Sequence, residues 1–138
     1  MRCTIMKLEA NKYRILETNV LLERFLTYRE VFTEYFKTMK IIERGEALRY
    51  ETYARLTDNY ISNIHRFIRL CNSYITKYQL EDSLIAQSLD NYFIDLIDAI
   101  NCLDTEHNLL DRLSLEASKA KIQSHEAEFM NTINFLVK

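Results

Sequence analysis

The sequence predicts an all-α protein, an antiparallel bundle of four long helices, and it leaves open a fifth, short helix at the N-terminus. Two observations support this fold class. The 138 residues contain no proline and a single glycine, Gly45, so the residues that most often interrupt or end helices are nearly missing. Three segments also place apolar side chains at alternating steps of three and four residues, which is the period of one helix face.

The first of these segments predicts a helix over residues 20–43, with the apolar series Phe25, Tyr28, Phe32, Tyr35, Met39 and Ile42. Arg44 and Gly45 predict its end, because a cation and a left-handed glycine both suit a helix C-terminus. Around Thr18 and Asn19 the apolar phase changes, from the series Met6, Tyr13 and Val20 to the series that begins at Leu21. A separate helix over 4–17 and a single kinked helix explain this change equally well.

The second and third helices are expected over residues 46–78 and 83–103. Asp82 or Ser83 is expected to cap the third helix. A wide apolar stripe on each helix is typical of packing against two neighbours in a bundle. The two series are Tyr60, Ile64, Phe67, Cys71, Tyr74 and Tyr78, and then Ala86, Leu89, Phe93, Leu96, Ile100 and Leu103.

The fourth helix is expected over residues 105–137, with Asp104 as a candidate cap. No strong helix breaker stands near Asp104, so one continuous helix over 83–137 is the alternative. Small side chains let helix axes approach closely, so the small-residue face of this helix is expected to lie against a neighbour. That face carries Leu110, Leu113, Ala117, Ala120, Ser124 and Ala127. Near the end of the helix the apolar stripe shifts to Phe129, Met130, Ile133 and Leu136, so a change of partner face is expected there.

Length and composition predict one domain over residues 1–138, in a soluble, cytoplasmic protein. Cys3, Cys71 and Cys102 are few, odd in number and far apart, which favours a reducing compartment over a disulfide scaffold. The N-terminus lacks the continuous apolar stretch of a signal peptide. Aliphatic runs such as Val20–Leu22 are far shorter than the roughly 20 residues that span a bilayer, so no membrane contact is expected.

The net charge of −2 hides a strong asymmetry along the chain. Residues 1–78 hold 14 Lys and Arg against 9 Asp and Glu, whereas residues 79–138 hold 4 against 11. Two interpretations stay open. The two parts attract one another within the fold, or one of them presents a charged face to an external partner.

The residues predict neither a catalytic site nor a cofactor or metal site. His65, His107 and His125 lack the neighbouring residues that phosphotransfer bundles, sensor kinases, di-metal bundles or helical nucleases require. With one glycine, the chain has no glycine-rich phosphate loop. We therefore expect a protein without enzymatic activity.

The function expected from these features is a helical protein–protein interaction module, such as an adaptor, chaperone, inhibitor or accessory factor, that forms an oligomer, for instance a homodimer. Tyrosine suits interfaces because it combines a large contact area with a polar tip. The candidate interface residues are Tyr28, Tyr35, Tyr53, Tyr74 and Tyr78.

The alternative is a nucleic-acid-associated protein that uses a basic face on the 46–78 helix. Arg55 and Arg69 stand fourteen residues apart, on the same side of a helix, and Arg66 lies one turn from Arg69. Clustered cations on one face are what phosphate binding requires. The sequence pI of about 5.9 is low for such a protein and places this interpretation second.

Overall fold

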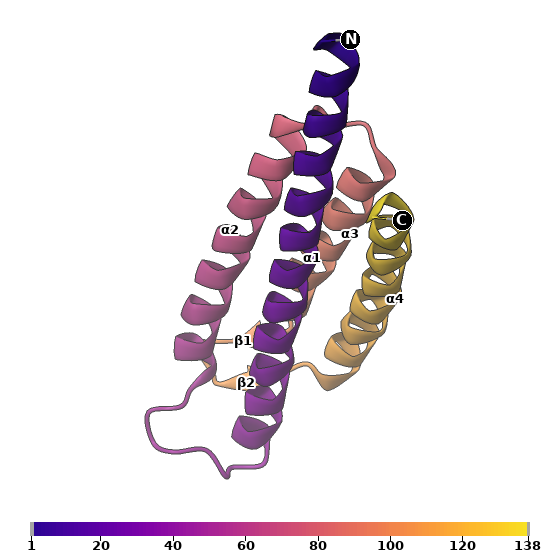
Figure 1. The fold of residues 1–138 in the computed structure, drawn as a ribbon. Coiled ribbons are helices and arrows are strands. Elements are labelled where there is room, and N and C mark those ends of the chain that lie inside the picture. Colours follow the sequence, from indigo (N-terminus) through magenta and orange to yellow (C-terminus); the bar gives the residue numbers. More distant parts are fainter. Residues whose placement is uncertain (1, 138) are drawn as a thin grey trace.

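The computed structural model describes the backbone of residues 2–137 and the side chains of residues 14–134. Within this part of the chain there are four helices, and a hairpin of two short strands precedes the last of them (Figure 1). The all-α prediction is therefore confirmed. The helices are α1 (Arg2–Glu43), α2 (Tyr53–Lys77), α3 (Leu84–Ile100) and α4 (Arg112–Val137), and the strands are β1 (Leu103–Asp104) and β2 (Leu109–Leu110).

The four helices run alternately in opposite directions, so helices consecutive in the sequence are antiparallel neighbours (Figure 1). α1 contacts α2 and α4, and α3 contacts the same two helices. α4 packs far more extensively on α3 than on α1. The sides of the bundle between α1 and α4 and between α2 and α3 are therefore less tightly closed than the side between α3 and α4.

One aromatic ring from each helix meets at the centre of the bundle. The Phe25 ring centroid on α1 lies 6.0 Å from that of Phe67 on α2. It lies 5.1 Å from the Tyr92 ring on α3 and 4.2 Å from the Phe129 ring on α4. All four residues are essentially inaccessible to solvent. The apolar series of the first three helices are buried or half-buried along their length, as the spacing predicts.

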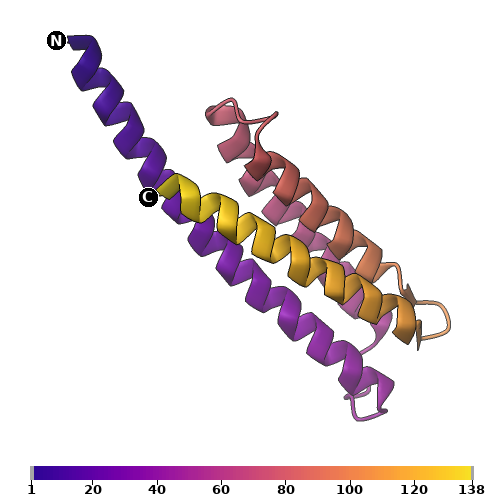
Figure 2. The ribbon, with the colours of Figure 1, turned by 90° about the vertical axis from the view of Figure 1, so that its right-hand side faces the viewer.

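α1 is one continuous helix from Arg2, so of the two alternatives the single long helix forms and the separate N-terminal helix does not. The Thr18 hydroxyl donates to the carbonyl of Arg14 at 2.6 Å and lies 2.5 Å from the Tyr74 hydroxyl of α2. The change of apolar phase marks instead where α1 begins to extend past the other helices (Figure 2). Ile15, Leu16 and Val20 are exposed there.

α1 is the longest helix, yet neither it nor any other helix in the described residues combines the length and the apolar character that crossing a membrane requires.

α2 begins at Tyr53, seven residues later than expected. Thr52 caps it by accepting a hydrogen bond from the Arg55 backbone N–H at 3.3 Å. The preceding residues 44–52 form a loop, in which Gly45 has the left-handed conformation with φ of 74°. The Leu48 and Tyr50 side chains in this loop are exposed, so no burial of these two residues favours a longer helix. The threonine cap therefore sets the start of α2.

α3 ends at Ile100 and α4 begins at Arg112, so the alternative prediction of one continuous helix over 83–137 is wrong. β1 and β2 pair antiparallel, with Leu103 opposite Leu110. The prediction that Asp104 caps the fourth helix is also wrong, because Asp104 lies in the hairpin turn: its Oδ1 accepts from the backbone N–H groups of Glu106 and His107, each at 3.2 Å. Asp111 takes the capping position of α4 by accepting from the Ser114 N–H at 3.2 Å.

In the first part of α4 the face that enters the core differs from the expected one. Near the end of the helix the expected shift to Phe129 and Ile133 is confirmed, and Leu136 lies outside the described side chains. Leu113 is 84% exposed, and the small residues Ala117, Ala120, Ser124 and Ala127 are exposed as well. The buried face carries larger apolar side chains, which remove more apolar surface from water than alanines do. Its members are Leu115, Ser118, Ile122, Phe129 and Ile133.

A carboxylate is buried where α3 meets α4. Asp95 is only 4% exposed, and its Oδ2 accepts a hydrogen bond from Nδ1 of His125 on α4. The outer nitrogen of the same imidazole, Nε2, lies 3.9 Å from Glu128 Oε2. A buried carboxylate requires such a partner because an unpaired charge in the core is strongly destabilising.

Candidate functional site

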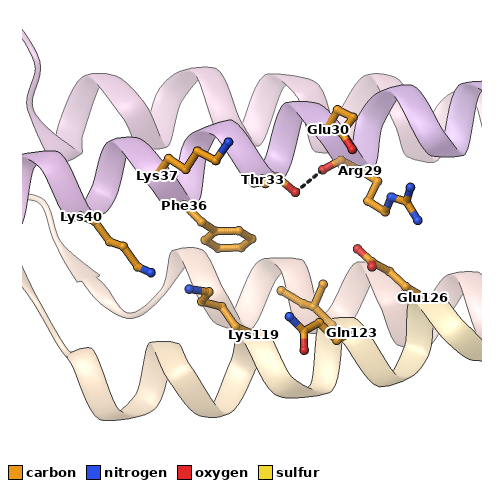
Figure 3. Close-up of a pocket in the computed structure, with 10 residues that line it drawn as sticks. Arg29, Glu30, Thr33, Phe36, Lys37, Lys40, Lys119, Gln123 and Glu126 are labelled. Carbon is orange, nitrogen blue, oxygen red and sulfur yellow. Dashed lines mark hydrogen bonds between the residues drawn. The ribbon is translucent and has the colours of Figure 1, made fainter.

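A groove with a volume of about 460 Å³ lies between α1 and α4 (Figure 3). Four cationic and two acidic side chains line it, around the Phe36 ring and Ile122. The lining residues are Arg29, Glu30, Thr33, Phe36, Lys37 and Lys40 from α1, and Lys119, Ile122, Gln123 and Glu126 from α4. The groove thus combines an apolar floor with charged walls.

The helical period explains why these residues converge. Arg29, Thr33, Phe36 and Lys40 recur at steps of four, three and four, so they lie along one side of α1. Lys119 and Glu126 on α4 stand seven residues, about two turns, apart on the facing side. Since α4 packs chiefly on α3, these two polar sides meet without closing on one another.

Three lysines occupy one end of the groove. Lys37 pairs with Glu34 at 3.1 Å, and Lys119 lies 3.6 Å from Glu116 and 5.8 Å from the centroid of the Phe36 ring. Lys40 makes no ion pair with any described residue. Lys40 and Lys119 reach toward one another from opposite helices (Figure 3). Two like charges that converge in this way attract an anion.

The other end of the groove holds Arg29, Glu30 and Glu126 (Figure 3). Burial raises the pKa of the Glu126 carboxyl above its ordinary value, and the nearby Arg29 guanidinium offsets only part of this rise. The Tyr92 phenol lies close to Glu126. Burial raises the pKa of Tyr92, and the negative charge of Glu126 raises it further. The Tyr92 hydroxyl is buried and finds no hydrogen-bond partner among the described residues.

Replacing Glu126 by glutamine is expected to raise the free energy of unfolding at pH 7 and to change it little at pH 4. The ordinary glutamate pKa is about 4.3. Because folding raises the pKa of Glu126, its ionisation costs stability as the pH rises above that value. Urea unfolding followed by circular dichroism at both pH values measures the difference. The same change at the exposed Glu23 is the control, and an equal gain at both pH values would contradict the prediction.

The three candidate arginines are exposed on α2, but they form no common site. Arg55 lies at the start of the helix, with its guanidinium 5.5 Å from the centroid of the Tyr50 ring. Arg69 is about 21 Å farther along the helix and borders a separate hollow together with Glu17 and Lys77. Arg66 stays near Arg69. The denser cationic cluster is the one between α1 and α4.

Two of the five candidate interface tyrosines belong to the core. Tyr53 is 1% and Tyr74 is 6% exposed, so neither offers a surface to a partner. Both can be buried because each hydroxyl has a hydrogen-bond partner inside the protein. Tyr53 donates to the Met39 carbonyl at 3.2 Å, and the Tyr74 hydroxyl is hydrogen-bonded to that of Thr18. Tyr28, Tyr35 and Tyr78 are half-buried.

The histidines lie in three different environments. His65 is exposed on α2, and His107 pairs with Asp104 in the hairpin at 2.8 Å. His125 is the one that holds the buried Asp95. In the part of the chain with described side chains, no three His, Cys, Asp or Glu residues come together in a way that could hold a metal ion. Cys71 and Cys102 are free thiols, and Cys3 lies outside the described side chains.

Comparison with known proteins assigns no family to the chain. It matches no protein-family model, and neither a curated protein nor a solved structure shows significant similarity to it. Function must therefore be argued from the groove and the surfaces around it.

The groove was not predicted from the sequence. The signal that was available is the series of polar residues on the outer side of the first helix, Arg29, Thr33, Lys37 and Lys40. Such a series is normally a solvated helix face. In this protein α4 lies beside that face of α1 and makes it one wall of a groove. No local sequence pattern predicts that α4 is the neighbour of this face.

Proposed function

We propose that this protein is a helical binding module whose groove between α1 and α4 receives an acidic, amphipathic segment of a partner protein. One observation carries the proposal. Lys40 and Lys119 converge from facing helices beside the apolar Phe36, and Lys40 lacks an ion-pair partner among the described residues. Carboxylates of a bound segment would neutralise these ammonium groups, while its apolar side chains cover the Phe36 ring and Ile122.

A protein partner fits the groove better than a nucleic acid does. A phosphate backbone is favoured by continuous positive charge, but Glu30 and Glu126 stand at one end of the groove. An apolar floor is, in contrast, typical of grooves that accept amphipathic helices. The net charge of −2 also disfavours a polyanion as the main partner. Nucleic-acid binding is therefore an outcome to be tested.

Exchanging both Lys40 and Lys119 for glutamine is expected to weaken binding of an acidic amphipathic helical peptide about tenfold. The two charge contacts contribute roughly 0.7 kcal/mol each, which together correspond to that factor. Fluorescence anisotropy of a labelled 18-residue peptide measures the affinity at low and at physiological salt. The loss is expected to be smaller at the higher salt concentration, because exposed charges are screened.

The matched control exchanges Arg66 and Arg69 for glutamine, which removes the same charge from the exposed face of α2. Its affinity for the peptide should stay within about twofold of that of the unmodified protein. Equal losses in both double variants, or no peptide binding at low salt, would refute the proposal. If a single-stranded oligonucleotide binds instead and only the α2 variant loses it, the nucleic-acid interpretation is the correct one.

A further inference from the structure

The two ends of the α1–α4 groove carry opposite charge. Lys37, Lys40 and Lys119 occupy one end, and Glu30 and Glu126 occupy the other, with Arg29 beside them (Figure 3). Glu34 and Glu116 pair with Lys37 and Lys119, which leaves the lysine end with a net charge of about +1 at neutral pH. Arg29 compensates one of the two glutamates, which leaves the glutamate end with a net charge of about −1. The groove therefore has a direction along its length.

From this direction we infer that the bound partner segment is a helix with segregated charge, acidic in the turn over the lysines and basic in the turn over the glutamates. The inference rests on the proposed function and specifies the partner for the same groove. Arg29 and Lys40 are eleven residues apart on α1, which is about 16 Å. A bound helix therefore needs about three turns: one acidic, one apolar over the Phe36 ring and Ile122, and one basic.

A uniformly acidic segment fits less well. Its last turn would bring carboxylates beside Glu126, which is half-buried and already disfavours the ionised state. Like charges in a partly desolvated position repel more strongly than they do in water. A basic side chain there would instead pair with Glu30 or Glu126. The polarity of the groove thus selects against the simplest anionic ligand.

The test compares two 18-residue peptides with the same central apolar turn. One has an acidic turn at one end and a basic turn at the other, and the other peptide is acidic at both ends. Anisotropy titrations with the unmodified protein are expected to give an affinity about fivefold higher for the charge-segregated peptide. Glu30→Lys reverses a charge at an exposed position of the glutamate end. This variant should remove or invert the preference.

The possible outcomes separate this inference from the proposed function. If the uniformly acidic peptide binds at least as tightly, and the Lys40/Lys119 double variant still weakens it, the inference is wrong and the proposed function stands. If neither peptide binds, both are wrong. An unchanged preference in the Glu30→Lys variant would also overturn the inference, and Glu23→Lys on the exposed face of α1 controls for the overall change in charge.

Discussion

Phe25→Ala is expected to lower the free energy of unfolding by about 4 kcal/mol, the largest effect predicted for any single substitution in this protein. Phe25 is fully buried, and its ring contacts one aromatic ring from each of the other three helices. Alanine would leave a cavity where all four helices meet. Urea unfolding followed by circular dichroism measures the loss.

A leucine at the same position is the matched variant. Phe25→Leu fills most of the space but removes the ring contacts, so it is expected to cost less than half as much as alanine. Leu16→Ala removes an exposed side chain of α1 and should change stability by no more than about 0.5 kcal/mol. A similar loss for Phe25→Ala and Leu16→Ala would show that the rings do not pack as described.

Removing the imidazole of His125 is expected to cost about 3 kcal/mol, because His125→Ala leaves the buried Asp95 carboxylate without its hydrogen-bond donor. The sequence offers a matched control. His107 also pairs with an aspartate, but both side chains of that pair are exposed in the hairpin, so His107→Ala should cost less than about 1 kcal/mol. The same urea unfolding experiment compares the two variants.

A double-mutant cycle tests the cause of this loss. Asp95→Asn removes the carboxylate charge, so His125→Ala should cost markedly less in the Asp95→Asn background than in the unmodified protein. Equal costs in both backgrounds would mean that the imidazole contributes by packing alone. A loss for His125→Ala as small as that for His107→Ala would mean that Asp95 is hydrated in the folded protein.

The prediction from sequence succeeds where one bulky apolar series specifies one helix. The series from Ala86 to Leu103 is buried at every position, and Ser83 caps α3 as expected by accepting from the Ala86 N–H at 3.2 Å. It fails for the first part of α4, where two faces have the helical period and the buried one is not the face of small residues. It also fails between Ile100 and Arg112, where the turn is made by Asp104 and by Asn108 in the left-handed conformation, with φ of 54°.

For the candidate site, the sequence predicted the kinds of charged residue involved but not where they come together. The sequence shows the cations on the first helix and the acidic excess of the second part, and it suggests an anionic partner. The arginines of α2 were preferred because three of them share one side of a single helix. Lys40 and Lys119 are 79 positions apart in the sequence, and no local pattern links them. The self-association expected from the sequence stays a prediction.

The sequence by itself determined the helical class, the side of the first three helices that enters the core, and the end of α1 near Gly45. These properties depend on backbone propensity and on the period of apolar residues, both of which are local. Only the tertiary structure decided which face of α4 is buried, that Asp95 has His125 as its partner, and that lysines of α1 and α4 share a groove. Each of these depends on which helices are neighbours, and that choice follows from the fit of large side chains across the whole core.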